Sequence, residues 1–218
     1  MTAFSDEFYR DILEGLAVYA DSSFYRDILT TLTRHQEPAI AVALNKNQMA
    51  SKRWLADSLH GTVGSSLGHV LILGGWVGAL GAVLLHDRRF DIERIVSVDI
   101  DPRCAPVAES LNATNVRSGR FASRTADMLS LEYGGDDAAN LVVNTSCEHL
   151  ADFPRWYARI PAGQLVVLQS NDYFACTEHV NSVPDLATFK AQAPLSDVRF
   201  AGERKLRRYT RFMLIGRK

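Results

Sequence analysis

The feature that most constrains the fold is an alternation of short strand-like runs with helix-like segments, which begins at residue 70. The first run, residues 70–73, is apolar throughout, as is typical of a strand buried on both faces of a sheet. Such alternation predicts a mostly parallel sheet with helices on both faces. Strands are expected over residues 70–73, 94–100, 121–127, 139–144 and 164–169, and helices over residues 79–86, 102–112, 151–160 and 184–192.

The two ends of the chain depart from this alternation. Residues 197–205 and 209–216 resemble two strands joined by a short turn, which predicts a terminal antiparallel pair. Apolar residues in the first 60 positions recur at helical spacing instead. Helices are therefore expected over residues 8–19, over 24–32, after Pro38 and over 48–59, and the glycines at 61, 64 and 68 predict a flexible joint after them.

A hexapeptide, Phe-Tyr-Arg-Asp-Ile-Leu, occurs at residues 8–13 and again at residues 24–29. Two copies do not make a repeat protein. The repetition favours two similar amphipathic helices that pack on the same body.

Composition excludes several classes of protein. The 218 residues suit one α/β domain plus an extension, and 47% hydrophobic with 22% charged residues is typical of a globular chain. A net charge of -1 gives no basic surplus, so nucleic acid is not an expected partner. The basic cluster at residues 204–208 is interpreted as a solvated turn.

Cysteine spacing and hydropathy predict whether the chain holds a metal, disulfides or a membrane span. The three cysteines, at positions 104, 147 and 176, form no Cys-x-x-Cys pair, so we expect neither a metal site nor a disulfide framework. The longest apolar stretch, residues 77–85, is far below the ~20 residues that span a bilayer. The N-terminus lacks a signal-peptide pattern. The expectation is a soluble cytoplasmic protein without a membrane partner, and a homodimer is compatible with it.

The first motif with chemical content is the glycine turn, residues 73–78, which joins the first strand to a helix. Glycine lets the backbone approach a ligand closely, and a helix N-terminus offers unpaired N–H groups. Because Gly74 and Gly75 are adjacent, the turn does not match the dinucleotide pattern G-x-G-x-x-G. The turn alone predicts only that some ligand approaches it.

Acidic residues follow the next two strands. Asp99 can accept hydrogen bonds from both hydroxyls of a ribose. Asp127 can bind an adenine amino group while Met128 packs on the ring, although a surface turn would also explain Asp127. Asp101, which precedes Pro102, is better interpreted as a helix N-cap than as a ligand. These positions lie at the carboxyl ends of parallel strands, where open α/β sheets bind ligands.

The order and spacing of these elements resemble those of the class I S-adenosylmethionine (SAM)-dependent methyltransferases. The resemblance covers residues 68–218 and implies a Rossmann-like α/β domain with seven strands, mostly parallel, and an antiparallel C-terminal hairpin. Residues 1–67 are left as a helical lid or extension. SAM is the implied cofactor, with glycines facing its methionine part, Asp99 its ribose, and Asp127 with Met128 its adenine. The cofactor-binding candidates are Gly74, Gly75, Trp76, Gly78, Asp99, Ile100, Asp127, Met128, Asn144 and Ser146.

The segment after the fourth strand departs from the better-known subfamilies. DNA and protein amino-methylating enzymes carry Asn/Asp-Pro-Pro-aromatic there, whereas this chain has Asn-Thr-Ser-Cys-Glu-His at residues 144–149. That difference disfavours methylation of a nucleobase or a glutamine. Residues 144–150 and 167–174 also resemble uncharacterised phage and bacterial methyltransferase-like proteins. That resemblance does not indicate a substrate.

Candidate catalytic residues lie in and after this segment. Histidine is suited to proton transfer near neutral pH, so His149 and the adjacent Glu148 are catalytic candidates, but both could instead cap the next helix. Asn144 could orient an amine or a carboxylate. Tyr173 and Trp76 follow strand ends, where an aromatic ring can stabilise a sulfonium.

The segment at residues 45–54 is unusually polar. Lys52 or Gln48 could hold the SAM carboxylate, or the segment could be a solvated helix face.

Three functions fit these residues. The first is methyl transfer to a small molecule. The second is a SAM-consuming aminocarboxypropyl transferase or cyclase, similar to azetidine-2-carboxylate synthases, which releases methylthioadenosine and can use SAM itself as the substrate. The third is a non-catalytic protein with this fold that binds a partner through its N-terminal helices.

Overall fold

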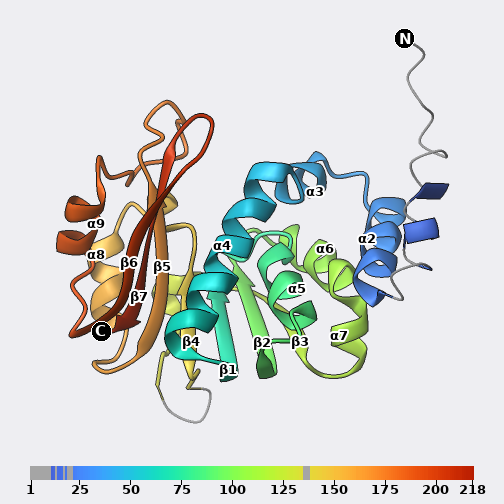
Figure 1. Ribbon diagram of the computed structural model, residues 1–218, viewed down its shortest axis with the longest axis horizontal. Coiled ribbons are helices and arrows are strands. Elements are labelled where there is room, and N and C mark those ends of the chain that lie inside the picture. The colour runs from blue at the N-terminus through green and yellow to red at the C-terminus, as the bar shows by residue number, and fades with distance from the viewer. Residues whose placement is uncertain (1–10, 13, 17, 19–21, 135–137) are drawn as a thin grey trace.

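The computed structural model describes residues 11, 12, 14–16, 18, 22–134 and 138–218 (Figure 1). Half of the residues of the helix expected over 8–19, and most of the first hexapeptide copy, lie outside the described residues, and residues 11, 12, 14–16 and 18 are helical. The helices are α2 (Ser23–Arg34), α3 (Pro38–Ala43), α4 (Lys46–Val63), α5 (Ala79–His86), α6 (Cys104–Leu111), α7 (Ala113–Arg117), η1 (Met128–Ser130), η2 (Cys147–His149), α8 (Phe153–Arg159) and α9 (Leu186–Gln192). The strands are β1 (Ser66–Leu73), β2 (Asp91–Asp99), β3 (Phe121–Thr125), β4 (Leu141–Asn144), β5 (Leu165–Asn171), β6 (Asp197–Lys205) and β7 (Thr210–Arg217).

The described strands form one seven-stranded sheet in the order β3-β2-β1-β4-β5-β7-β6. Neighbours among β1 to β5 pair in parallel, whereas β7 is antiparallel to both β5 and β6. All residues of β4 and β5 are buried, which explains the apolar runs at residues 141–143 and 165–168, and both strands end in buried polar residues. The predicted fold class, a mostly parallel α/β sheet with a terminal antiparallel hairpin, is confirmed.

Two large apolar clusters cover the two faces of the sheet. One joins α4 and α5 to alternate residues of β1, β4 and β7, such as Ile72, Val143 and Ile215. The other joins α8 and α9 to the intervening residues, such as Val142 and Leu214. Because strand residues point alternately to opposite faces, each strand contributes to both clusters. The sheet therefore lies between two helical layers.

Helix α4 belongs to this core, and only residues 64 and 65 of the expected joint lie outside α4 and β1. Leu55, Ala56 and Leu59 of α4 are fully buried against the sheet. The helix continues through Gly61 and ends where Gly64, at φ 98°, provides the left-handed turn. Strand β1 begins at Ser66, so the expected domain boundary between residues 67 and 68 falls inside β1. Burial of one helix face outweighs the low helix propensity of a single glycine.

Helix α2 is fixed to the same body by polar contacts that sequence spacing did not predict. The carboxylate of Asp27 accepts hydrogen bonds from the backbone N–H of Thr114, at 2.9 Å, and from its hydroxyl, at 3.1 Å. Thr31 donates to the hydroxyl of Ser110 at 3.3 Å. Asp27 is 4% exposed, so α2 packs closely against α6 and α7. No helix among the described residues is long and apolar enough to cross a membrane.

Candidate active site

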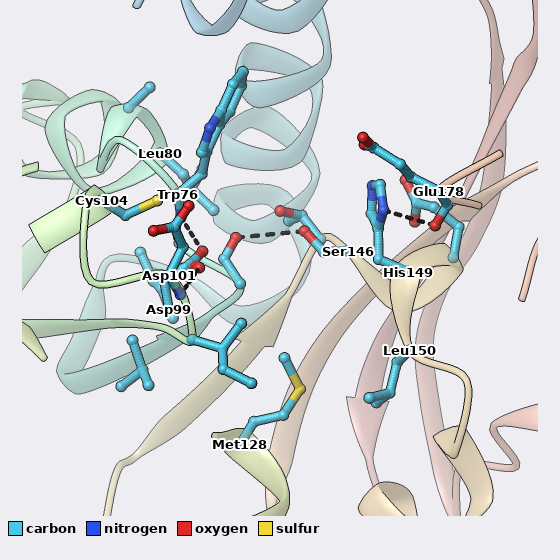
Figure 2. A pocket seen from close by; sticks show the side chains of 18 of the residues that line it. Trp76, Leu80, Asp99, Asp101, Cys104, Met128, Ser146, His149, Leu150 and Glu178 are labelled. Atoms are coloured by element: carbon cyan, nitrogen blue, oxygen red, sulfur yellow. Dashed lines mark hydrogen bonds between the residues drawn. The ribbon is translucent and has the colours of Figure 1, made fainter. Parts of the chain in front are cut away.

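A cavity of about 750 Å³ opens at the carboxyl edge of the parallel strands. Its walls come from the glycine turn, from the loops after β2, β3 and β4, and from the first turns of α4 (Figures 1 and 2). This volume is typical of small-molecule sites, which span ~300–1,000 Å³. The cavity lies at the edge of the sheet where the sequence predicted a ligand-binding site.

The glycine turn lines the cavity through Gly74, Gly75 and Trp76. Gly74 has φ 60°, and a Cβ there would lie 3.0 Å from the Cβ of Ser146. A Cβ on Gly75 would overlap the hydroxyl of Ser97. Trp76 also has a positive φ, 49°, and its backbone N–H donates to Asp99 at 2.8 Å. The two glycines are therefore needed for the shape of the turn, and the turn is tied to the acid after β2.

Gly78 does not line the cavity, contrary to its expected place beside the cofactor. It has φ 75° at the N-cap of α5, and a Cβ there would lie 2.9 Å from the Cβ of Ala108 and 2.8 Å from the amide nitrogen of Asn112. The need for glycine here comes from close packing of α5 on α6.

We expect Gly78→Ala to destabilise the protein more than Gly119→Ala. Both positions have nearly the same positive φ, 75° and 76°, but no described atom lies within 4 Å of a Cβ on Gly119. Gly119→Ala should cost about 1–2 kcal/mol of unfolding free energy, from backbone strain. Gly78→Ala should cost at least about 1 kcal/mol more, because overpacking adds to the strain. Urea denaturation measures both, and equal losses would contradict the packing role.

Asp99 lies on the cavity wall with both carboxylate oxygens anchored to backbone. Oδ2 accepts from Trp76 and Oδ1 accepts from the N–H of Asp101, at 3.0 Å. No ion pair to Asp99 occurs among the described residues. Each oxygen keeps a free lone pair, so the carboxylate is fixed in place and can still accept hydrogen bonds from a ligand.

Asp101 makes a capping contact at the start of this helical segment, as expected, although the helix itself begins later. Its carboxylate accepts from the backbone N–H of Arg103 and pairs with the Arg103 guanidinium at 2.6 Å, which lowers the pKa of Asp101. Helix α6 begins later, at Cys104, with Arg103 as the N-cap. Burial, followed by the nearby Asp99, raises the pKa of the Cys104 thiol to about 12, so this cysteine on the cavity wall is not a thiolate at neutral pH.

The loop after β3 contributes Asp127 and Met128 to the cavity. Asp127 caps η1 by accepting from the N–H of Leu129 at 2.8 Å. Ile100 also lines the cavity, and 69% of its surface is exposed although it is apolar. The capping contact does not use all the lone pairs of Asp127, so the turn role and a ligand role are compatible.

Asn144 does not line the cavity, although it was a candidate for both cofactor binding and catalysis. The residue is fully buried, and its Oδ1 accepts from the N–H of Ser146 at 2.9 Å. Its amide nitrogen lies 3.6 Å from the sulfur of Met128. Ser146 does line the cavity and donates to the carbonyl of Gly74 at 3.4 Å. Asn144 therefore orients the backbone of Ser146 and does not itself face the cavity.

Glu148 is buried in an ion pair and does not cap the next helix, as one interpretation of the sequence had it. It is 2% exposed, and its Oε1 accepts from Asn171 at 2.6 Å and from Arg211 at 3.3 Å. Arg211 is a residue of this site that no sequence pattern indicated. The available signal was a lone arginine at the start of the apolar run in β7, residues 212–215.

His149 lines the cavity beside Glu178, whose carbonyl oxygen lies 3.1 Å from its Nδ1 (Figure 2). Tyr173 does not line the cavity. Its ring stacks on Tyr209, with centroids 5.6 Å apart, and meets the edge of His179 at 5.7 Å. Burial lowers the pKa of His179. The structure therefore places His179, whose ring contacts both His149 and Tyr173, next to the one histidine of this group that lines the cavity.

Lys52 and Gln48 of α4 both line the cavity, so this helix face is not simply solvated. The ammonium of Lys52 donates to Gln48 at 3.0 Å. Burial, followed by repulsion from Arg211, lowers the pKa of Lys52 to about 8. Lys52 has no carboxylate partner among the described residues, which leaves a cation available for an anionic ligand.

The fold is that of the class I SAM-dependent methyltransferases. NodS, an N-methyltransferase from Bradyrhizobium japonicum solved with S-adenosylhomocysteine, superimposes with a TM-score of 0.62 at 13% identity, over 90% of this chain and 97% of that one. A geranyl diphosphate methyltransferase solved with SAM superimposes with a TM-score of 0.55 at 13% identity, over 77% of this chain and 85% of that one. The [4+2]-cyclase SpnF superimposes with a TM-score of 0.58 at 12% identity, over 81% of this chain and 84% of that one. No family model and no curated protein sequence matches the chain.

Proposed function

We propose that this protein is a SAM-dependent methyltransferase that acts on a small molecule. The observation that carries the proposal is the cavity at the carboxyl edge, which is lined by the glycine turn, by the carboxylate of Asp99 and by the ammonium of Lys52, and neither of these two charges has an ion-pair partner among the described residues. Structural neighbours solved with SAM and with S-adenosylhomocysteine support the choice of ligand. SAM, when bound, supplies an electrophilic methyl group on its sulfonium.

The residues of the cavity fit the parts of SAM. Asp99 would hold the ribose hydroxyls, because its oxygens are fixed by backbone N–H groups and pair with no cation among the described residues. Ile100 and Met128 offer apolar surface for the adenine ring, and exposed Ile100 would lose contact with water on binding. Gly74 and Gly75 allow close approach of the methionine part, and Lys52 is placed to pair with its carboxylate.

The other end of the cavity, formed by Glu148, His149 and Glu178, is left for the acceptor. Methyl transfer needs mainly correct positioning of a nucleophile and, where the nucleophile is protonated, removal of its proton. Since a carbonyl oxygen can only accept, Nδ1 of His149 is the donor to Glu178, and Nε2 of the neutral ring carries a free lone pair. That lone pair can bind a proton or another electrophile.

The role of Lys52 predicts a pH dependence of ligand binding. Its pKa of about 8 is lowered from 10.5, so the ammonium is charged below pH 8 and loses its proton above it. Affinity for S-adenosylhomocysteine, which keeps the carboxylate, should fall by about tenfold between pH 7 and pH 9. The ligand's own amino group titrates in the same range. The Lys52→Met variant therefore serves as control, and an identical pH profile in it would remove Lys52 from the site.

Identification of the products separates methyl transfer from the alternative use of SAM. The purified protein is incubated with SAM, alone and with candidate acceptors, and products are identified by mass spectrometry against a protein-free control. We expect S-adenosylhomocysteine to accumulate only with an acceptor. Methylthioadenosine formed from SAM alone would instead show an aminocarboxypropyl transferase or a cyclase that consumes SAM.

A further inference from the structure

A cluster of three potential metal ligands lies at the acceptor end of the cavity. One carboxylate oxygen of Glu148 and one ring nitrogen each of His149 and His179 lie within 4.8 Å of one another. The two histidine rings meet edge to face, with centroids 4.6 Å apart. Small side-chain rotations would let one ion contact all three groups.

Backbone carbonyl groups orient both histidine rings through their Nδ1 atoms. Nδ1 of His149 lies 3.1 Å from the carbonyl of Glu178, and Nδ1 of His179 lies 3.2 Å from the carbonyl of Tyr173. A carbonyl oxygen accepts only, so both Nδ1 atoms carry the proton, and Nε2 of each neutral ring keeps its lone pair. Metal-binding histidines are commonly oriented by this kind of contact with a backbone carbonyl.

The carboxylate of Glu148 gives an independent sign of a missing partner. Its Oε1 accepts from Asn171 and Arg211, but its Oε2 is buried and has no hydrogen-bond partner in the described part of the chain. Glu148 is 2% exposed. An unpaired buried carboxylate oxygen costs free energy, and a cation bound there would remove that cost.

We propose that Glu148, His149 and His179 form a binding site for one divalent transition-metal ion. Two imidazoles and one carboxylate are the protein ligands of zinc and non-haem iron sites that keep open coordination positions. Glu148 and His149 line the cavity, so the open positions face the acceptor. This contradicts the expectation from cysteine spacing that the chain holds no metal, because spacing rules do not detect ligands brought together by the fold.

The charges around the cluster indicate what the metal would bind. Arg211 and Lys52 both line the cavity, and Nε of Arg211 is buried without a partner among the described residues. A metal ion beside these cations favours an anionic ligand. The acceptor would therefore be an ionisable oxygen, a hydroxyl or a carboxylate, bound to the metal at its nucleophilic atom. This second step rests on the proposed function, whereas metal binding does not.

Metal binding is tested with the full chain in the absence of SAM. The protein is treated with EDTA, titrated with cobalt(II), and followed by visible absorption and by metal analysis after dialysis. We expect one cobalt per chain in the wild type and at least about tenfold weaker binding in His179→Ala and in His149→Ala. His69→Ala is the matched control, because His69 is exposed at β1 and contacts a single carboxylate, Glu93.

The outcomes of the cobalt experiment can be distinguished from those that test the proposed function. Thermal melting and S-adenosylhomocysteine binding show whether each variant is folded. Folded His179→Ala with wild-type cobalt affinity, or a wild-type protein that binds no cobalt, would overturn the metal site. A wild type that binds cobalt but not SAM would keep the metal site and refute the methyltransferase.

Discussion

Asp99→Ala should weaken SAM binding at least tenfold, which is the largest effect on affinity that we expect from one substitution. The carboxylate is oriented by two backbone N–H groups, from Trp76 and Asp101, and has no cation partner among the described residues. Its free lone pairs can accept from both ribose hydroxyls, and hydrogen bonds to a charged group contribute about 1.5–3 kcal/mol each. Calorimetric titration with SAM measures the change.

The neighbouring acid provides the control for this experiment. Asp101 also lines the cavity, but its carboxylate is paired with Arg103 at 2.6 Å. Asp101→Ala should therefore change SAM affinity much less than Asp99→Ala. Equal effects would show that the general negative charge matters rather than a specific contact, and unchanged affinity in Asp99→Ala would remove Asp99 from the site.

Arg211→Met should be the most destabilising of the substitutions considered. Arg211 and Glu148 are 7% and 2% exposed, and removal of one partner of a buried pair leaves the other charge uncompensated. Such losses are about 3–5 kcal/mol of unfolding free energy. Arg211 also donates to the carbonyl of Thr145, at 3.2 Å, so the loop after β4 loses a contact as well. Urea denaturation at neutral pH measures the change.

Two comparisons isolate the buried pair. Arg53→Met removes an ion pair to Asp57 in which both side chains are exposed, so it should cost less than about 1 kcal/mol. The double variant Arg211→Met with Glu148→Gln should lose less stability than the sum of the two single variants. Strict additivity would mean that the two side chains stabilise the fold independently.

The sequence predicted those parts of the molecule that depend on local pattern. Apolar runs and their spacing located each strand of the sheet, and strand ends located Asp99 and Asp127 at the cavity. Local pattern did not show where packing determines the position of a residue, and two candidates, Gly78 and Asn144, do not line the cavity. Gly78 is required by the side chains of α6, and Asn144 supports a turn rather than a ligand.

The acceptor end of the cavity could not be predicted, because its residues meet only through the topology of the sheet. Arg211 reaches Glu148 because β7 inserts beside β5 and runs antiparallel to it. His179 joins His149 because the loop after β5 folds back over η2, where the N–H of Asn181 donates to the carbonyl of Glu148 at 2.8 Å. No spacing rule connects residues that lie 30 or 60 positions apart.

The most direct measurement is a calorimetric titration of the purified full-length chain with SAM, near neutral pH and with Asp99→Ala beside it. SAM binding at one site per chain, weakened at least tenfold in the variant, is the result that the cavity predicts. Absence of SAM binding by a folded wild-type protein would contradict the proposed function, whatever the outcome of the cobalt experiment.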